Sequence, residues 1–455
     1  STDYVGAVKA GETPWYEGWT LPGTIAIAAA APSYDFASCD SGVCTISGTV
    51  DQDYTMVAGT DYVLSGTVKV GDGNGVISSA TEMSAIQAAG VTLTIEPGVD
   101  VKGSSDGILL VTRGSKLVAD GTASAPITFS SLDADYDGMG EWGGIVVQGF
   151  APQYGAGGTG ACFADGEAWC NVEGEGGTTI ANYGGNLPAD NSGVIRYVRI
   201  AEGGLVAGPN NEVNGLTLQG VGHGTQISHV QVHGNLDDGI EWFGGTANVT
   251  HAVLTNNDDD DIDFDEGFQG NIQYALVIKR QDEGAVPVGS NDPRGLELNS
   301  SDGDYVPETA GSVANVTVIG GDAANSKSEF GMRIRGSVTA NIYNSAVAGY
   351  DNTCARIDDS DHDGSSATAK IDTPATFTNF LCDTAGTAFL KEQPADGSTG
   401  IVLEGINFDS NLAITNASAS VAATTIAAVD NGSGFAFDST DYVGAVKAGE
   451  TPWYE

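Results

Sequence analysis

Short runs of apolar and β-branched residues alternate with polar residues along most of the chain. From Val91 the text reads VTLTIEPGVDVKGSSDGILLVTRGSKLVADGTASAPITFSS, and each run ends at Gly, Asp or Pro. Such alternation predicts one half-buried strand for each run. The runs follow one another too closely for the helical crossovers of an α/β sheet, which need about a dozen residues or more. The pattern therefore predicts an all-β protein.

The middle of the chain repeats itself. Ile227–Gly245 (ISHVQVHGNLDDGIEWFGG) aligns with Val249–Gly267 (VTHAVLTNNDDDDIDFDEG), and looser copies continue to Glu392. Each copy holds a strand, an Asn/Asp turn, a second strand and a Gly. A repeat of about 20–25 residues built in this way is typical of a solenoid whose coils stack strand on strand.

EPGVDVKG, GSKLVADGTASAPITFSS, EWGGIVVQG and DDGIEWFGG resemble secreted right-handed parallel β-helix proteins of the pectate-lyase-like kind, including bacterial surface proteins. The resemblance covers roughly residues 60–435. It implies a single elongated β-helix with terminal linker or capping segments, whereas a β-propeller or a β-sandwich is the structural alternative. We expect a coupling segment and linker at 1–30, the β-helix at 31–435 and a second coupling segment at 436–455. This fold carries lyases, hydrolases, adhesins and inert surface proteins, so it does not fix the function.

The segment STDYVGAVKAGETPWYE occurs twice, at Ser1–Glu17 and at Ser439–Glu455. A tandem array, an assembly traced with overlap or an engineered duplication would each explain the identity. Open sheet edges at the two ends of a solenoid need a cap or invite another chain. The duplicated segment is therefore predicted to join units head to tail, by packing its large apolar side chains on an exposed coil. These are Tyr4, Val5, Val8, Trp15 and Tyr16, with their copies Tyr442, Val443, Val446, Trp453 and Tyr454.

Charge narrows the choice of partners. The chain has 60 acidic and 17 basic residues, a formal net charge of −43. This charge disfavours binding to nucleic acid or to an anionic membrane, and it favours cations and a saline or calcium-rich exterior.

Six cysteines fall into local pairs. These are Cys39 with Cys44, Cys162 with Cys170, and Cys354 with Cys382. Three disulfides are predicted, and with them a secreted, extracellular protein at the cell surface. The chain shows no candidate transmembrane segment, because the apolar run at 24–32 is far shorter than the roughly 20 residues needed.

Two acidic motifs have the spacing of calcium loops. Asp133, Asp135 and Asp137 precede Gly138, and Asp359, Asp361 and Asp363 precede Gly364. Carboxylates at positions 1, 3 and 5 with Gly at position 6 can wrap a loop around a hard cation. Neither copy has Glu at position 12, so Glu141 is the candidate closing ligand of the first site. An Asp-rich turn without metal is the alternative.

A third acidic group repeats at the coil period. Asp237, Asp238 and Glu241 lie one coil before the acidic run Asn256–Gly267, and together they form an acidic ladder. The carboxylates predicted to bind Ca²⁺ are Asp237, Asp238, Asp258, Asp259, Asp260, Asp261, Asp263 and Asp265. Equivalent positions of stacked coils lie about 4.8 Å apart. Like charges at that spacing are unfavourable unless cations lie between them. Asp263 and Asp265 alternate with Ile262 and Phe264 and are expected to face outward.

Catalytic motifs are less specific. Gly222–Gly224 (GHG) and Arg333–Arg335 (RIR) resemble pieces of the polygalacturonase pattern, but His223 precedes the paired Asp residues instead of following them. A lyase would place calcium on the acidic ladder and use an arginine as base. The candidate bases are Arg280, Arg294, Arg333 and Arg335.

His229 and His251 occupy matching positions of adjacent coils and predict a stacked side-chain ladder rather than a metal site. The aromatic residues Trp142, Trp242 and Phe243 would contact sugars in an adhesin, or else serve packing.

The main hypothesis is a non-enzymatic, calcium-stabilised β-helix that polymerises into a surface filament or array. The first alternative is a polysaccharide lyase or hydrolase acting on an acidic polysaccharide, and the second is a carbohydrate-binding adhesin.

Overall fold

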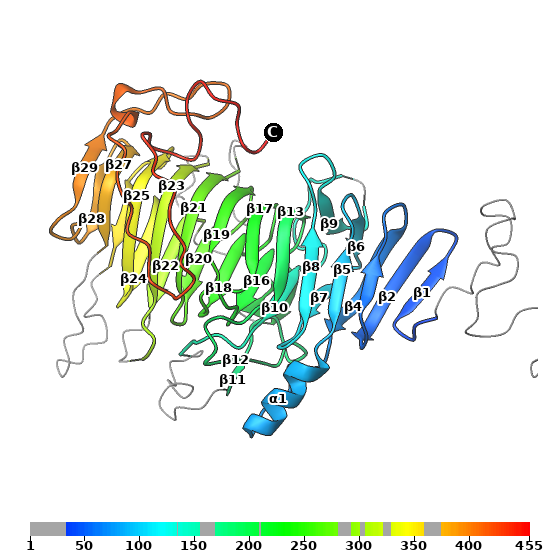
Figure 1. The fold of residues 1–455 in the computed structure, drawn as a ribbon. Helices are drawn as coiled ribbons and strands as arrows, with labels where there is room; N and C mark the ends of the chain where they lie inside the picture. The colour runs from blue at the N-terminus through cyan, green and yellow to red at the C-terminus, as the bar shows by residue number, and fades with distance from the viewer. Residues whose placement is uncertain are drawn as a thin grey trace, which may run out of the picture.

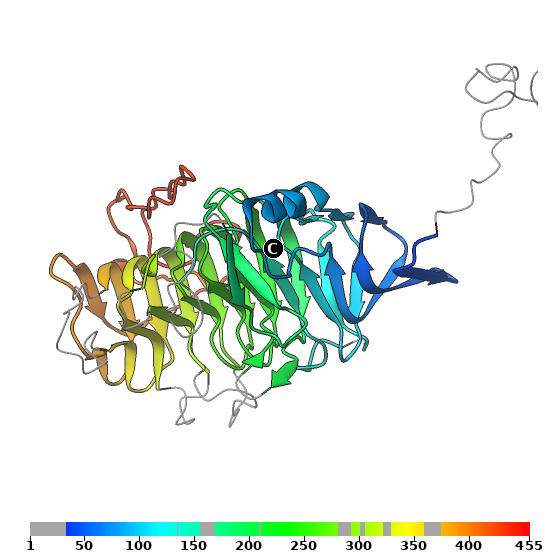
Figure 2. The same ribbon diagram turned by 90° about the horizontal axis from the view of Figure 1, so that it is seen from below.

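The computed structural model describes residues 33–133, 135–154, 169–208, 211–280, 293–300, 305–321, 329–358 and 375–455. There the chain winds into an elongated right-handed parallel β-helix, whose coils follow one another in sequence order along a single axis (Figures 1 and 2). The predicted all-β solenoid is confirmed, and the propeller and the sandwich are excluded.

Three parallel sheets form the walls of the helix. Sheet 1 consists of single strands, one for each coil: β7 (Ile108–Val111), β10 (Ile145–Gln148), β16 (Leu216–Gln219), β18 (Ile240–Phe243), β20 (Ile262–Asp265), β22 (Leu296–Ser300), β24 (Phe330–Gly336), β26 (Thr353–Ile357) and β28 (Thr387–Lys391).

Sheets 2 and 3 share long bent strands, each of which contributes its first half to sheet 2 and its second half to sheet 3. They are β13 (Gly193–Ala201), β17 (Gln226–His233), β19 (Val249–Thr255), β21 (Gln269–Ile278), β23 (Ala310–Ile319), β25 (Thr339–Ala348) and β27 (Thr376–Asp383).

In the first coils the two sheets have separate strands. Sheet 2 begins with β3 (Tyr54–Met56), β5 (Thr92–Ile95) and β8 (Lys116–Asp120). Sheet 3 contains β2 (Val43–Val50), β6 (Asp100–Gly103) and β9 (Ile127–Ser131), and it ends with β29 (Thr399–Leu403). Strand β4 (Asp61–Val70) passes from sheet 3 into sheet 1.

The remaining elements are small additions to the solenoid. They are β1 (Ala37–Asp40), antiparallel to β2, the hairpins β11 (Trp169–Glu173) with β12 (Asn182–Gly185) and β14 (Val206–Gly208) with β15 (Asn211–Glu212), the helix α1 (Ala80–Ala89) and the 3₁₀ turn η1 (Ala417–Ala419). Among the helices that the structure describes, none is long and apolar enough to cross a membrane.

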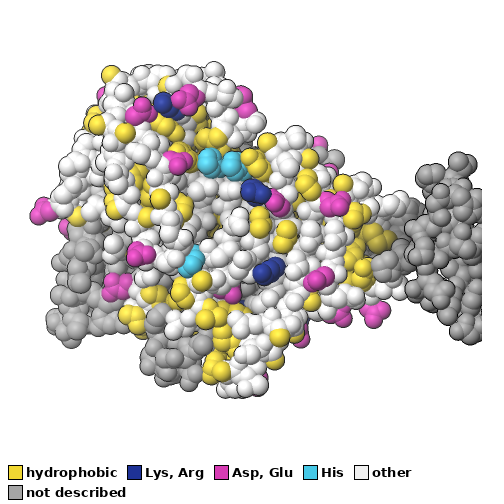
Figure 3. Space-filling model, in the orientation of Figure 1, with side chains coloured by type: hydrophobic (Ala, Val, Ile, Leu, Met, Phe, Trp, Pro, Cys, Tyr) yellow, Lys and Arg dark blue, Asp and Glu magenta, His cyan; other side chains and the backbone are white. Residues whose placement is uncertain are grey.

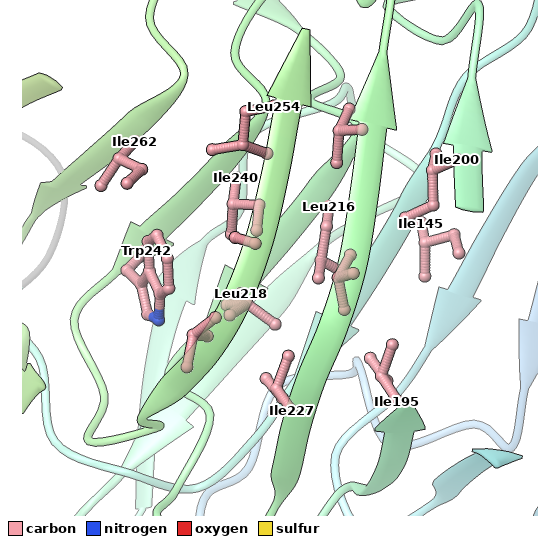
Figure 4. Close-up of a cluster of buried hydrophobic side chains, with 14 of the residues drawn as sticks. Ile145, Ile195, Ile200, Leu216, Leu218, Ile227, Ile240, Trp242, Leu254 and Ile262 are labelled. Carbon is pink, nitrogen blue, oxygen red and sulfur yellow. The ribbon is translucent and has the colours of Figure 1, made fainter. Parts of the chain in front are cut away.

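The core fills the interior between the sheets. Parallel register places Leu216, Ile240 and Ile262 in one column. Trp242 and Phe264 lie in the next column, and Figure 4 shows the inward direction of the labelled side chains. Each coil is therefore stabilised by burying apolar area against the coils on either side.

Trp142 and Trp242 belong to this core. Their exposed fractions are 0% and 1%, and Phe243 packs beside the buried Tyr183. The two tryptophans are too deeply buried to contact a sugar, and their role is packing.

Side chains of successive coils also stack at the bend between sheets 2 and 3. One residue of each bent strand has positive φ: Tyr197, His229, His251, Tyr274, Asn315, Asn344 and Asn379. The rings of His229 and His251 stack with centroids 4.4 Å apart and planes 6° apart. The predicted histidine ladder is confirmed, and its continuation through tyrosine and asparagine was not predicted.

The C-terminal copy of the duplicated segment lies along this bend. Figure 1 shows the chain after β29 running back over the outside of the coils. Gly444 N donates to Asn344 O over 2.8 Å, and Val443 and Val446 are 1% and 3% exposed. The Trp453 ring meets His251 edge to face at 4.9 Å.

The segment thus packs on its own solenoid along the flank, with Tyr442 and Tyr454 in the same contact area. The residues Tyr4, Val5, Val8, Trp15 and Tyr16 of the N-terminal copy lie outside the described residues.

Two of the predicted disulfides are present. Cys39 is bonded to Cys44 across β1 and β2, and Cys354 is bonded to Cys382 between β26 and β27. Cys170 is also disulfide-bonded, while Cys162 lies outside the described residues. The cysteine pattern is therefore a disulfide framework.

Arg113 anchors the β11–β12 hairpin to the solenoid. It is fully buried, and its guanidinium group donates to main-chain carbonyl oxygens of Gly73 (2.9 Å), Gly75 (2.5 Å), Cys170 (2.5 Å) and Gly184 (3.3 Å). Burial lowers the pKa of Arg113 to about 10. Because the last two carbonyls belong to β11 and β12, this side chain holds the hairpin in place beside sheet 1.

We expect Arg113→Met to lower the free energy of unfolding by about 3 kcal/mol, since it leaves buried carbonyl groups without donors. Chemical denaturation measures the change. Arg199→Met is the matched control, because Arg199 is exposed on the outer side of sheet 3. Equal stability of the two variants would show that Arg113 is not an anchor.

Candidate functional site

The outer face of sheet 1 carries a row of ionisable side chains in register. Successive strands β18, β20, β22 and β24 pair Glu241 with Asp263, Asp263 with Glu297, and Glu297 with Arg333. Arg333 then pairs with Arg356 on β26. The row exists because these residues alternate with core residues along each strand, which turns them outward.

Turns that follow sheet 3 bring further carboxylates to the acidic end of this row. Asp237 and Asp238 lie in the turn after β17, and Asp259 lies in the turn after β19. One carboxylate oxygen each of Asp238, Glu241 and Asp263 lie within 4.8 Å of one another, and so do those of Asp237, Asp238 and Asp259. We call Asp237, Asp238, Glu241 and Asp263 the acidic cluster.

Hydrogen bonds hold part of the acidic cluster in place. Asn214 Nδ2 donates to Glu241 Oε2 over 2.5 Å, and the backbone N–H of Asp260 donates to Asp238 Oδ1 over 2.8 Å. Among the described residues, the buried Oδ1 of Asp263 meets no hydrogen-bond partner. The same part of the chain offers no ion pair to any of the four cluster residues. The cluster therefore has unused acceptor capacity.

Burial makes the negative charge of the cluster costly. It raises the pKa of Asp238, Glu241 and Asp263 well above the usual range, and the neighbouring carboxylates raise these pKa values further. Burial and the charge of Asp259 raise the pKa of Asp237 to about 8. Charged carboxylates this close need a cation or must take up protons.

The other end of the row is basic. Glu297, which is 4% exposed, accepts from Arg294 and from Arg335, each over 2.5 Å. Arg333 and Arg356 share Asp358 through their Nε atoms, at 3.1 Å and 2.7 Å.

Arg335 is 41% exposed at its side chain, and its Nε has no hydrogen-bond partner among the described residues. The face thus changes from acidic to basic across neighbouring strands.

Several carboxylates of the predicted ladder have partners of their own. Asp261 forms an ion pair with Lys279 at 2.9 Å, and Asp260 accepts from Arg294 N over 3.0 Å. Asp265 accepts from Asn299 Nδ2 over 2.7 Å. Asp258 is 3% exposed in the same turn as Asp259. The predicted outward direction of Asp263 and Asp265 is confirmed, because Ile262 and Phe264 lie in the core.

The β11–β12 hairpin adds Glu175 to the acidic end. Burial raises the pKa of Glu175 to about 7, although the interaction with the Glu241 carboxyl group lowers that pKa. On the same hairpin, Tyr183 donates to Glu266, whose pKa burial raises to about 8. The hairpin therefore covers one flank of the site with protonatable groups.

The first calcium-like loop lies apart from sheet 1, in the turn after β9. Asp133 and Asp137 gather there with Glu202. Asp135 is exposed and outside this group. Asp359, Asp361 and Asp363 of the second loop lie outside the described residues.

Sequence reasoning missed Glu297, Glu175, Asn214 and Glu202. Glu297 could have been found, because Leu296–Leu298 repeats the apolar–acidic–apolar pattern of Ile262–Phe264. Glu175 and Asn214 lie in irregular segments without a repeat, so only the structure places them near Glu241. Of the arginines considered for a lyase, the structure brings Arg294, Arg333 and Arg335 to the site, and Arg280 follows the end of β21.

Comparison with known proteins gives a family and one solved structure. A family model described as "Pectate-lyase like beta helix domain" matches residues 77–436. The crystal structure of an alginate lyase from Paenibacillus sp. str. FPU-7 shares 14% identity and covers 75% of this chain and 98% of that chain, with a TM-score of 0.25. A likeness at that level carries no information on activity. A search of curated proteins found no match.

Raised pKa values predict an inverse dependence of stability on pH. Asp237, Glu175 and Glu266 titrate higher in the folded chain than in the unfolded chain. Their contribution to stability is therefore complete below an unfolded pKa of about 4 and is lost as pH rises through about 7 to 8. In chelator, the free energy of unfolding should fall between about pH 4 and pH 8.

Asp237→Asn should make this fall smaller and raise the melting temperature at the higher pH by about 2 °C or more. The control is Asp396→Asn, since Asp396 is an exposed carboxylate remote in sequence from the cluster. Thermal unfolding at each pH measures the effect, and stability that rises with pH would contradict it.

Proposed function

The chain belongs to the pectate-lyase-like β-helix family, and on this premise we propose that it is a polysaccharide lyase that cleaves an acidic polysaccharide. The observation that carries the proposal is the row on sheet 1. There Glu297 on β22 lies between the acidic cluster and the arginines of β24 and β26. These arginines are Arg333, Arg335 and Arg356.

The main hypothesis from the sequence, a non-enzymatic filament subunit, is wrong. The matching family model is that of a pectate-lyase-like domain, which favours the enzymatic alternative. The segment expected to join subunits also packs on its own solenoid, where Ala445 and Val446 are buried.

The acidic cluster fits a hard divalent cation, and we assign it Ca²⁺. All donors are oxygens, Asp263 Oδ1 has no partner among the described residues, and Asp238 and Glu241 form no ion pair there. Oxygen-only donor sets suit calcium rather than zinc or copper. When bound, the ion supplies positive charge that holds a uronate carboxylate and acidifies the proton next to it. Asp238, Glu241 and Asp263 would hold it.

The basic end supplies the groups that grip and deprotonate the sugar. The chain has only 17 Lys and Arg residues, yet three arginines occupy one face of two adjacent strands, β24 and β26. Guanidinium groups bind carboxylates in a bidentate manner. Arg333 and Arg356 are assigned to uronate carboxylates along the row.

Arg335 is assigned to the proton at C5. Its side chain is partly exposed, and its Nε has no hydrogen-bond partner among the described residues. The positive charge of Arg335 also lowers the pKa of Asp263, which shows that the two groups interact. In the β-elimination, C5 loses its proton to the base, the C4–O4 bond breaks, a C4=C5 double bond forms, and the departing oxygen takes up a proton. No oxidant or reductant is needed.

We propose that this enzyme is secreted and extracellular. Two of the three predicted disulfides are described in full by the structure, and the net charge is −43. Both features support this location. Disulfides form in oxidising compartments, and polymeric uronates would be met outside the cell.

Incubation of the full chain with polygalacturonate and with alginate tests the proposal. Unsaturated, ultraviolet-absorbing chain ends are expected from at least one of them. Arg335→Gln should lower kcat by about 10²-fold or more, the range for loss of a general base. Arg199→Gln, on the outer side of sheet 3, should leave the rate unchanged. Saturated reducing ends would show a hydrolase, and no cleavage of either polymer would contradict the proposal.

Chelation should abolish this cleavage, and Ca²⁺ should restore it. Asp263→Asn should raise the Ca²⁺ concentration needed for half-maximal rate by about tenfold or more, because a ligand charge is lost. Asp396→Asn is the matched control. Full activity in chelator would overturn the assignment of calcium to the acidic cluster.

A further inference from the structure

The turn after β9 forms a loop that closes over the end of β13. Glu141 N donates to Glu202 O over 2.9 Å, and Gly140 N donates to Gly203 O over 2.7 Å. The Trp142 indole N–H donates to Ala201 O over 2.7 Å. These bonds hold the two turns together and bring the acidic loop residues over Glu202.

Three carboxylates converge under this loop, and that of Glu141 interacts with two of them. Oxygens of Asp133, Asp137 and Glu202 lie within 4.8 Å of one another. A hydrogen bond from Ser131 lowers the pKa of Glu141, but burial and the charges of Asp133 and Glu202 raise it more, so that its pKa lies above the usual value. Glu141 is therefore close enough to interact electrostatically with Asp133 and Glu202.

Glu202 is the residue that distinguishes this cluster from an ordinary acidic turn. It is 0% exposed, and its Oε2 accepts from Ser131 Oγ over 2.9 Å. Its other oxygen, Oε1, is buried and has no hydrogen-bond partner among the described residues. A buried carboxylate oxygen without a donor costs free energy unless something positive faces it.

No positive side chain of the described residues neutralises the cluster. Lys102 is the nearby cation, but its Nζ donates to Ser130 Oγ over 2.8 Å and to the main-chain oxygen of Asp133 over 2.9 Å. None of the four carboxylates forms an ion pair within the described ranges.

We infer that Asp133, Asp137, Glu141 and Glu202 form a binding site for a hard divalent cation of the calcium type, separate from sheet 1. The carboxylates can supply most of the six to eight oxygen ligands that calcium takes. Glu202, from the following coil, replaces the missing Glu at position 12 of the loop. A Cβ on Gly138 would lie 2.1 Å from Glu141 Oε1, so the glycine is needed for Glu141 to fold back.

A cation bound at this site would stabilise the turn after β17, which leads into the acidic cluster. The loop reaches the next turn through Tyr136 O, which lies 3.1 Å from His233 Nε2, and Gly140 lies against Leu236. Asp237 and Asp238 follow Leu236 directly. Binding at the loop therefore stabilises the segment that presents these two carboxylates.

Terbium luminescence of the full chain tests the site, since Tyr136 and Trp142 lie in the loop and can sensitise bound Tb³⁺. We expect luminescence that Ca²⁺ displaces. Glu202→Gln and Asp137→Asn should each weaken this binding by about tenfold or more. Asp135→Asn is the matched control in the same loop and should bind as the wild type does, and Asp263→Asn should retain the loop signal.

Asp137 is exposed, so its variant tests the site even if Glu202→Gln fails to fold. Wild-type Tb³⁺ affinity in Asp137→Asn, or an equal loss in Asp135→Asn, would overturn the inferred ligand set. These outcomes do not depend on lyase activity, because the readout is metal binding alone.

Discussion

The parallel register of the coils is the constraint on which the rest of the structure depends. Each coil repeats the path of the previous one, so a side chain has its counterpart about 4.8 Å away on the next strand. In the interior this places Ile240 against Ile262 and Trp242 near Phe264, which is favourable. At the bend it stacks His229 on His251. On the outer face of sheet 1 the same rule places Glu241 beside Asp263, where like charges repel.

The chain resolves this repulsion differently along sheet 1. Toward the C-terminal end, Glu297 is surrounded by Arg294 and Arg335, so the charges cancel within the protein. At the acidic cluster no such partner exists among the described residues, and the carboxylates remain costly. An enzyme can use this contrast, because a site that needs a cation lies two strands from guanidinium groups that can hold an anionic sugar. On the face that Figure 3 shows, by contrast, the acidic side chains are scattered and form no cluster.

Periodicity makes much of this predictable. The alternation in IDFD predicts that Asp263 faces outward and Ile262 inward, and the coil repeat aligns Asp263 with Glu241, as the strand register confirms. Periodicity cannot place residues outside the repeat. Glu175 comes from a hairpin inserted between β10 and β13, and Glu202 reaches Asp133 only through the fold of a turn. The duplicated segment led to a wrong functional hypothesis, because the apolar residues of its C-terminal copy pack on the same chain.

We propose the acidic cluster as a cation site that serves the arginines of sheet 1. Anomalous diffraction from crystals of the full chain grown with Tb³⁺ tests it most directly. We expect a peak within bonding distance of Asp238, Glu241 and Asp263. A structure with no peak there at saturating Tb³⁺, and with the carboxyl groups hydrogen-bonded to one another as protonated acids, would contradict it.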